Sequence, residues 1–242
     1  MFKAVKANNV AQLKVILNKD GIDVNATTRG LFDSGKTALH IATEKGKTEC
    51  VGLLLAHKKI DVNARTINGV LNLGDYTPLH LAAQHGKTEC LKLLLSAPGI
   101  DVNTQLTEGV RKGATPLFLS MSQDDVECVK LLLKQRGIDV NVQNEKGLTA
   151  LHIAVEYGFT ECVRELLSDK RINVDIATNK GETPLKLADH SENVHRQEIL
   201  SLLQLHRKIK QDQITFNFKA HSTSLFSSKY YLVVLFVLIL IV

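Results

Sequence analysis

The sequence predicts an all-α repeat protein, an α-solenoid in which about six helix pairs stack on one another. A six-residue phrase that begins with Thr and has Leu at its third position occurs five times in the chain. The copies begin at Thr37, Thr77, Thr115, Thr149 and Thr183, with steps of 40, 38, 34 and 34 residues. Self-similarity at such a period is typical of repeat architectures. One short helical unit cannot bury its apolar face alone, so the units are expected to stack.

Two further phrases keep the same spacing. Ile-Asp-Val-Asn occurs at 22–25, 60–63, 100–103 and 138–141, and the related Ile-Asn-Val-Asp occurs at 172–175. A phrase that ends in Glu-Cys opens the second helix of four units, at 46–50, 86–90, 124–128 and 158–162. The three phrases in register resemble the ankyrin repeat family, whose unit has about 33 residues and a Thr-Pro-Leu-His-x-Ala signature.

The resemblance covers about residues 2–205. It implies the ankyrin fold, in which each unit has a β-hairpin finger, two antiparallel helices and a loop leading to the next finger. It also implies a non-enzymatic protein that binds partner proteins, usually through the finger tips and the exposed side of the first helix. The identity of the partner does not follow from the resemblance.

Local residue choices agree with this interpretation. Thr can cap the first helix of a unit, and Pro, which follows Thr in three copies, has a φ suited to a helix start. Gly46, Gly86 and Gly158 can adopt the positive φ of the tight turn between the two helices, and Asp124 replaces them in one unit.

The two ends of the repeat array differ from its middle. Residues 2–17 align with both helices of the next unit, and Asn8 aligns with Gly46, but no finger precedes them. We interpret them as the N-terminal cap. The last unit has Lys186 in place of the signature His and about three additional residues between 189 and 197, which favours a C-terminal cap.

The net charge of +5 is concentrated near the C-terminus. Residues 206–229 carry five Lys or Arg and one Asp, a charge of +4, which leaves about +1 for the rest of the chain. We therefore expect an ankyrin-repeat domain at 1–205, a basic and polar linker at 206–229 and a hydrophobic segment at 230–242. The nearly neutral repeat domain lacks the basic stripe of nucleic-acid-binding proteins, so no nucleic-acid partner is expected.

The sequence offers no residues for catalysis. It contains no Gly-rich phosphate-binding loop and no G-x-S-x-G element, so we expect no catalytic residue, no cofactor and no small-molecule substrate. Four cysteines occupy equivalent places in their repeats, about 10 Å apart for packed helices, which is too far for a disulfide. We expect them to be free and buried. They are Cys50, Cys90, Cys128 and Cys162.

Three signature histidines also form a column along the repeats: His40, His80 and His152. The spacing of the repeats prevents these side chains from converging on one metal ion, which needs ligands within about 2 Å of it. We expect no metal site and predict that the histidines hydrogen-bond between neighbouring turns.

The fingers differ in length. The segments at 26–36, 64–76 and 104–114 have 11, 13 and 11 residues, whereas those at 142–148 and 176–182 have seven each. Apolar residues in exposed loops often mark contact sites, so we hypothesise a partner-binding face on the three long fingers. Its residues are Leu31, Phe32, Val70, Leu71, Leu73, Tyr76, Leu106 and Val110. The alternative is that the long fingers pack on one another and bury these residues.

The third copy of the signature departs from the others at Phe118, Ser120, Met121 and Ser122. Two interpretations remain open, a local specificity patch and neutral drift in a tolerant repeat.

The last 13 residues, 230–242, are uninterruptedly apolar. As a helix they span about 20 Å, against about 30 Å of hydrocarbon in a bilayer, and counting from Leu225 lengthens the segment to 18 residues. Lys229, Tyr230 and Tyr231 suit the membrane interface. Basic residues precede the segment, so the positive-inside rule predicts a single-pass tail anchor with the ankyrin domain in the cytosol. The alternatives are a truncated reading frame and a strand that packs on the repeats.

The sequence therefore predicts a scaffold or adaptor that contacts lipid through its C-terminus and recruits a protein partner to a membrane surface. The alternative is a soluble ankyrin modulator, or a host-directed effector, whose tail is truncated or does not insert.

Overall fold

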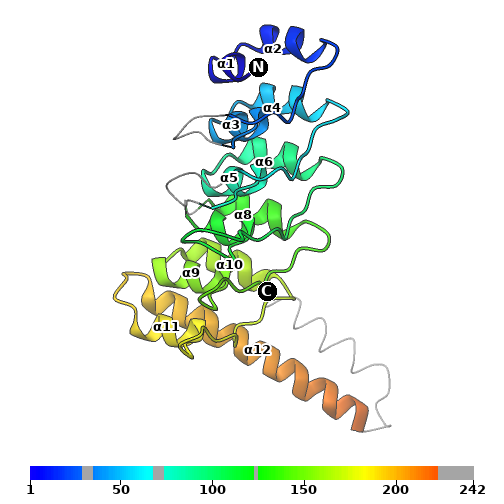
Figure 1. The fold of residues 1–242 in the computed structure, drawn as a ribbon. Helices are drawn as coiled ribbons and strands as arrows, with labels where there is room; N and C mark the ends of the chain where they lie inside the picture. Colours follow the sequence, from blue (N-terminus) through cyan, green and yellow to red (C-terminus); the bar gives the residue numbers. More distant parts are fainter. Residues whose placement is uncertain (29–34, 68–73, 123–124, 223–242) are drawn as a thin grey trace. The chain divides into compact units, whose positions relative to one another are not determined.

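The computed structural model describes residues 1–28, 35–67, 74–122 and 125–222. These residues form twelve helices (Figure 1). Their bounds are α1 Phe2–Lys6, α2 Val10–Leu17, α3 Ala38–Glu44, α4 Thr48–Leu55, α5 Pro78–Gln84, α6 Thr88–Leu95, α7 Pro116–Ser120, α8 Val126–Leu133, α9 Ala150–Tyr157, α10 Thr160–Ser168, α11 Pro184–His190 and α12 Arg196–Ser222. The chain divides into two compact units, Met1–Leu200 and Ser201–Val242.

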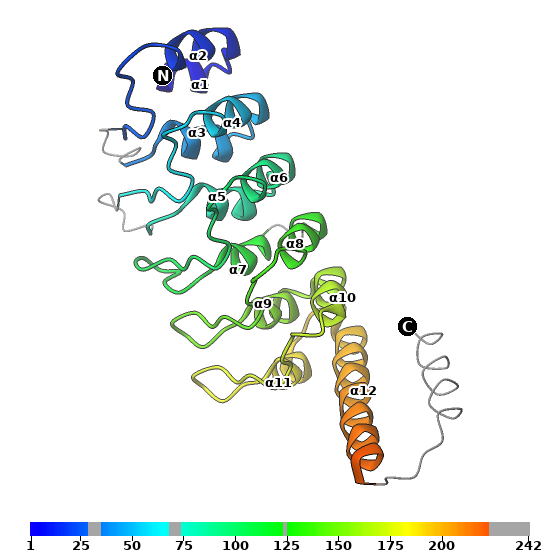
Figure 2. The same ribbon diagram turned by 90° about the vertical axis from the view of Figure 1, so that its right-hand side faces the viewer.

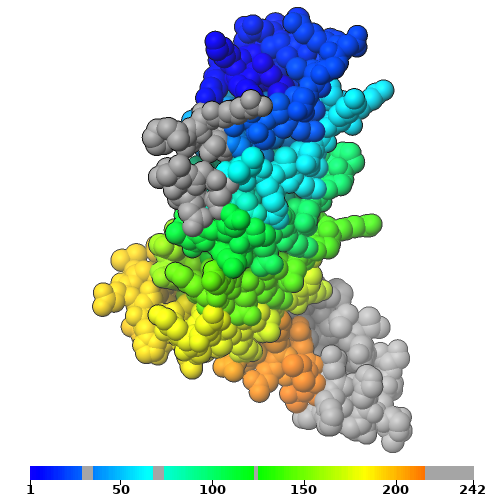
Figure 3. Space-filling model, in the orientation of Figure 1, coloured from blue at the N-terminus to red at the C-terminus, as the bar shows by residue number. Residues whose placement is uncertain are grey.

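In the first unit the helices lie in two layers. The inner helices α1, α3, α5, α7, α9 and α11 pack in sequential order, and the outer helices α2, α4, α6, α8 and α10 form the second layer (Figures 1 and 2). The N-terminal cap is the pair α1 and α2, and five repeats follow, each beginning with a finger. We number them repeats 1–5 and their fingers as finger 1 (26–36), finger 2 (64–76), finger 3 (104–114), finger 4 (142–148) and finger 5 (176–182). The predicted sequential stacking is confirmed, and in the space-filling view successive repeats adjoin without a break (Figure 3).

Threonine caps start the inner helices of the five repeats, as predicted. Thr37 Oγ1 accepts a hydrogen bond from the His40 amide, and His40 Nδ1 accepts one from the Thr37 amide. The same reciprocal arrangement occurs between Thr77 and His80 and between Thr149 and His152. These helices have only 7 or 8 residues, and helices shorter than about 12 residues are marginal alone. Their stability therefore depends on caps and on stacking.

The core consists of aliphatic side chains between the layers. Leu39, Leu79 and Leu117 are 0% exposed, and equivalent leucines in the outer layer are also buried. The four cysteines are free and at most 1% exposed, which confirms the prediction that they act as small buried apolar residues.

The turn between the helices of a pair needs a left-handed backbone. Gly46, Gly86 and Gly158 have φ of 64°, 57° and 76°, and Asn8 has φ of 52° at the matching place in the cap. The predicted role of these residues is confirmed. Asp124 lies outside the described residues.

The Ile-Asp-Val-Asn phrase connects each repeat to the next. Asn63 Nδ2 donates to the Gly99 carbonyl (2.7 Å), and Asn63 Oδ1 accepts from the Asp101 amide (3.0 Å). Asp61 Oδ1 accepts from the Asn63 amide (3.0 Å) and holds this loop in a turn. The same pair of contacts recurs from Asn25, Asn103 and Asn141 to the following repeat.

The prediction of β-hairpin fingers was wrong as regards strands. The described residues contain no β-strand, and their only bridge joins Thr27 to Thr37. Among the described residues, one or two backbone hydrogen bonds join the two sides of each finger, such as Leu106 N to Ala114 O (3.0 Å) and Gly113 N to Leu106 O (2.7 Å). So few bonds close a turn but do not form the continued ladder of a strand pair.

The predicted linker at 206–229 is helical as far as Ser222, because α12 continues through 27 residues without Gly or Pro. Its polar composition suggested a loop, but Gln, Lys and Arg are good helix formers. Among the helices of the described residues, none is long and apolar enough to cross a bilayer. Residues 230–242, together with Lys229, lie outside that part of the chain, and the membrane anchor stays a prediction.

Candidate protein-binding surface

Fingers 3, 4 and 5 project from the inner helices on the side away from the outer helices (Figure 2). Fingers 3, 4 and 5 are joined at their tips, because the Glu145 amide donates to the Lys112 carbonyl and the Asn179 amide donates to the Lys146 carbonyl, both at 3.1 Å. This close approach requires glycine. A Cβ on Gly113 would lie 2.8 Å from Asn144 Cα, well inside ordinary contact.

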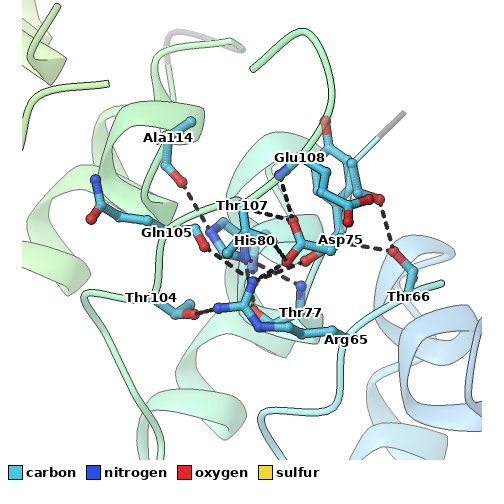
Figure 4. A network of polar contacts seen from close by, with 12 residues as sticks. Arg65, Thr66, Asp75, Thr77, His80, Thr104, Gln105, Thr107, Glu108 and Ala114 are labelled. Atoms are coloured by element: carbon cyan, nitrogen blue, oxygen red, sulfur yellow. Dashed lines mark hydrogen bonds and ion pairs between the residues drawn. The ribbon is translucent and has the colours of Figure 1, made fainter. Parts of the chain in front are cut away.

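A buried carboxylate joins fingers 2 and 3 (Figure 4). Asp75, which is 7% exposed, accepts hydrogen bonds from the Thr107 amide (2.8 Å), the Thr107 hydroxyl (2.9 Å) and the Glu108 amide (3.3 Å). It also pairs with Arg65, whose guanidinium donates to Thr104 Oγ1 (2.8 Å) and the Gln105 carbonyl (3.0 Å). The polar contacts therefore fix the long finger 3 to the base of finger 2.

Asp75 is ionised in this setting. Burial raises the pKa of its carboxyl group, but the hydrogen bonds from Thr107 and Arg65 outweigh the effect of burial and hold the pKa below its usual range. The carboxylate therefore belongs to a satisfied structural network, which gives it no free lone pair for acid–base chemistry.

The signature histidines connect repeats beneath the fingers. Because Nδ1 of His40 accepts from a backbone amide, Nε2 carries the proton and donates to the Tyr76 carbonyl of the next repeat (2.9 Å). His80 reaches the Ala114 carbonyl (3.3 Å) and His152 the Glu182 carbonyl (3.2 Å) in the same way. Burial lowers the pKa of His40 and of His80 from 6.5 to about 4, so both rings are neutral at pH 7. The predicted contacts between neighbouring turns are confirmed.

Repeat 3 lacks this contact. Phe118 occupies the place of the histidine and has no polar group to offer to repeat 4. The inner helix α7 is also short, with five residues. Ser120, at the place where other repeats have Ala, donates its hydroxyl to the Leu117 carbonyl (2.7 Å), and this local bond competes with continuation of the helix.

An aromatic hollow of about 270 Å³ lies beside the short α7. Its lining consists of Arg111, Phe118, Met121, Ser122, Ile153, Tyr157 and Phe159. Tyr157 is 64% exposed, and its ring stacks on Phe159 with 5.7 Å between centroids. Arginine, tyrosine and other aromatic residues are enriched where proteins bind one another.

A second groove of about 700 Å³ crosses fingers 3, 4 and 5 and is lined mostly by polar and charged residues. Lys112, Lys146 and Lys180, at equivalent places in their fingers, line it together with Glu145, Glu156 and Glu182. The mixture of positive and negative charges favours a polar protein surface over a nucleic acid, which needs a uniformly basic groove.

The structure places only some of the predicted binding residues. Leu31, Phe32, Val70, Leu71 and Leu73 lie outside the described part of the chain, as do Tyr230 and Tyr231.

The three that are described differ in exposure. Val110 is 83% exposed and lines the polar groove, whereas Leu106 is 1% exposed and packs with Ala114, Leu119, Tyr76 and Phe118. Leu106 thus follows the packing alternative, and the binding face on the fingers stays a hypothesis.

Sequence reasoning missed Arg111, Tyr157 and Phe159. A signal was present in the sequence at the turn between the two helices of a repeat. Tyr157 and Phe159 flank Gly158 in repeat 4, whereas His85 and Lys87 flank the equivalent Gly86 in repeat 2. Two aromatic residues take the places of polar ones, Tyr157 at an exposed position and Phe159 at a half-buried one.

Comparison with known proteins defines the class. The family model for ankyrin repeats (3 copies) matches residues 1–106, 69–144 and 117–213. These matches extend over most of the chain, and it belongs to the ankyrin repeat family. Ankyrin repeats are protein-interaction modules and are in general not enzymes. Among curated protein sequences none matches this chain.

Solved ankyrin structures resemble the chain. The ankyrin repeat domain of Bcl-3, a unique member of the IkappaB protein family, has a TM-score of 0.67 and 26% identity over 83% of this chain and 79% of its own. An ankyrin repeat domain from Acinetobacter baumannii AYE has a TM-score of 0.70 and 26% identity, and the match covers 85% of this chain and 96% of that domain. The ankyrin repeat protein EF0377 is 24% identical, with a TM-score of 0.70, and the match covers 84% of this chain and 94% of EF0377. At this identity the similarity supports the fold and nothing further. Since 630 solved chains match, the fold does not specify a partner.

Proposed function

We propose that this protein is a non-enzymatic scaffold that recruits a protein partner to a membrane surface. The repeat array supplies the partner-binding face, and residues 230–242 supply the tether, with the repeats on the cytosolic side. The partner is a protein of unknown identity, and the second contact is membrane lipid.

The observation that carries the scaffold part is the joined finger face. Tip-to-tip backbone bonds and the Asp75 network hold fingers 3–5 and the base of finger 2 in fixed relative positions before any partner arrives. A preorganised surface binds without the entropic cost of ordering its loops. Loops on a rigid support are a common site of recognition.

The partner test uses the intact protein in its own cell. Proximity labelling is compared between the wild type and a variant with alanine at Phe32, Leu71 and Leu73, the apolar residues of the long fingers. We expect the variant to lose labelled partners and to keep its melting temperature. A lower melting temperature with unchanged labelling would favour the packing alternative for these fingers.

The tether part rests on the sequence of residues 230–242 and on the +4 charge of residues 206–229 before it. Its test is membrane fractionation of the full chain and of a variant without residues 225–242. We expect the full chain in the membrane pellet, resistant to salt and released by detergent, and the shortened variant in the supernatant. The same distribution for both would support the soluble modulator or effector instead.

A further inference from the structure

The aromatic hollow beside α7 contains the Arg111 guanidinium, which has no acidic partner among the residues that the structure describes. Among the described residues, the hydrogen bond made by the Arg111 guanidinium goes to the Ser122 hydroxyl at 3.4 Å. No carboxylate in that part of the chain forms an ion pair with Arg111. Two arginines that contact a neighbouring repeat or helix differ in this respect, since Arg65 pairs with Asp75 and Arg164 with Glu198.

The remaining lining of the hollow is apolar. Phe118 and Ile153 are half-buried, and the exposed Tyr157 forms one wall with Phe159. A volume of about 270 Å³ lies just below the range of sites for drug-sized ligands, about 300–1,000 Å³. The hollow is thus suited to one large side chain and not to a whole cofactor.

The hollow exists because repeat 3 departs from the repeat pattern. The short α7 ends at Ser120, and aromatic residues at 157 and 159 take the places of polar ones. These changes come from two different repeats, yet they meet at the same junction.

We propose that this hollow binds a peptide segment of the partner protein in which a large aromatic or aliphatic side chain stands next to a carboxylate. The apolar side chain enters between Phe118, Ile153 and Tyr157. The adjacent carboxylate accepts two hydrogen bonds from the Arg111 guanidinium, whose planar geometry matches a carboxylate. The proposal rests on the scaffold function above and names the chemistry of the segment recognised.

The chain contains no Trp, so the fluorescence of a tryptophan peptide reports its binding without background. Three decapeptides with identical Gly-Ser flanks carry Trp-Glu, Trp-Gln or Trp-Lys at the centre and are titrated with the full chain. We expect Trp-Glu to bind about tenfold more tightly than Trp-Gln, the effect of one charge-assisted contact, and Trp-Lys to bind most weakly. The emission of bound Trp should shift to the blue as the ring leaves water.

Four variants assign the effect to the hollow. Arg111→Gln should reduce Trp-Glu binding to the level of Trp-Gln, and Arg111→Lys should restore part of it by keeping the charge. Arg136→Gln, which makes the same change at an exposed site after α8, is the matched control and should leave binding unchanged. Tyr157→Ser should weaken all three peptides to a similar extent, and its 64% exposure leaves the melting temperature near that of the wild type.

Three outcomes would overturn the proposal: no binding of any peptide, equal binding of Trp-Glu and Trp-Lys, and equal losses in Arg111→Gln and Arg136→Gln. Cellular labelling separates this failure from failure of the scaffold function. If partner labelling persists in Arg111→Gln cells but is lost in the finger variant, the scaffold stands and the hollow is not its peptide site.

Discussion

Comparing Gly147→Ala with Gly181→Ala separates the backbone strain of a substituted glycine from the steric clash of its new side chain with a neighbour. The two glycines occupy equivalent places in fingers 4 and 5 and have φ of 77° and 76°. In this left-handed region alanine costs about 1–2 kcal/mol of stability, partly offset by about 0.4–1 kcal/mol from the less flexible unfolded chain. Both variants therefore share the same backbone cost.

Only one of the two variants meets a neighbour. A Cβ on Gly147 would lie 2.6 Å from the Asn179 amide nitrogen, whereas a Cβ on Gly181 would meet no atom within 4 Å. Finger 5 must then retreat by roughly 0.8 Å to restore ordinary contact. The movement breaks the bonds from Asn179 N to Lys146 O (3.1 Å) and from Asn179 Nδ2 to Glu145 O (2.8 Å). At about 0.5–1.5 kcal/mol for each bond, Gly147→Ala should lose about 1–3 kcal/mol more than Gly181→Ala.

Urea unfolding followed by circular dichroism measures this difference. The full chain and both variants are compared in the same buffer, and the free energies of unfolding are subtracted. Equal losses in the two variants would refute the reasoning, because they would show that the finger tips do not depend on their mutual contact.

Three more substitutions test the joints between repeats. His80→Phe removes a ring that is neutral in the folded protein, where its pKa is about 4, but protonated in the unfolded chain below about pH 6.5. The stability of the wild type should therefore fall as the pH drops from 6.5 to 4. In urea titrations over that range, the variant should lose about 1.4 kcal/mol less stability per pH unit than the wild type. An unchanged pH slope would contradict this. Asp75→Ala should lower the free energy of unfolding by about 1–3 kcal/mol, a range that is discounted for the partial exposure of Arg65. It should also speed hydrogen exchange at the Thr107 and Glu108 amides, and unaltered exchange there would mean that the network does not hold finger 3. Asn103→Ala removes hydrogen bonds to Gly137 and Asp139 and should lower the free energy of unfolding by about 1–3 kcal/mol. The control Asn18→Ala, at an exposed helix end, should change it by no more than about 0.5 kcal/mol. Similar losses in the two variants would mean that the asparagine contacts do not join the repeats.

The sequence was sufficient for the repeat architecture because its evidence is local and repeated. Thr caps, glycine turns and leucine stretches each act within a few residues, and five copies made their register unambiguous. The signature histidines could be placed by the same argument, since they recur at one place in three of the five repeats and therefore form a column along the stack.

The finger contacts could not be predicted in this way. Asp75 contacts Thr107, 32 residues later, and that pairing depends on how two long loops of different length fold against each other. The burial of Leu106 has the same origin, because loop composition alone does not show which apolar residue turns inward. The role of Asn63 and its equivalents was visible as a pattern, but its bonds to the next repeat appear only in three dimensions.

The junction between repeats 3 and 4 shows how the array tolerates an unusual repeat. There the inner helix is short and the histidine contact is missing, two changes that weaken the stack at its middle. The fingers still join these two repeats outside the helices, through the bond from the Glu145 amide to the Lys112 carbonyl and the bond from Gln105 Nε2 to the Gln143 carbonyl (3.3 Å). These contacts remain where one hydrogen bond, worth about 1 kcal/mol, is missing. This arrangement leaves the aromatic hollow open without leaving the array loose, as a preorganised binding site requires.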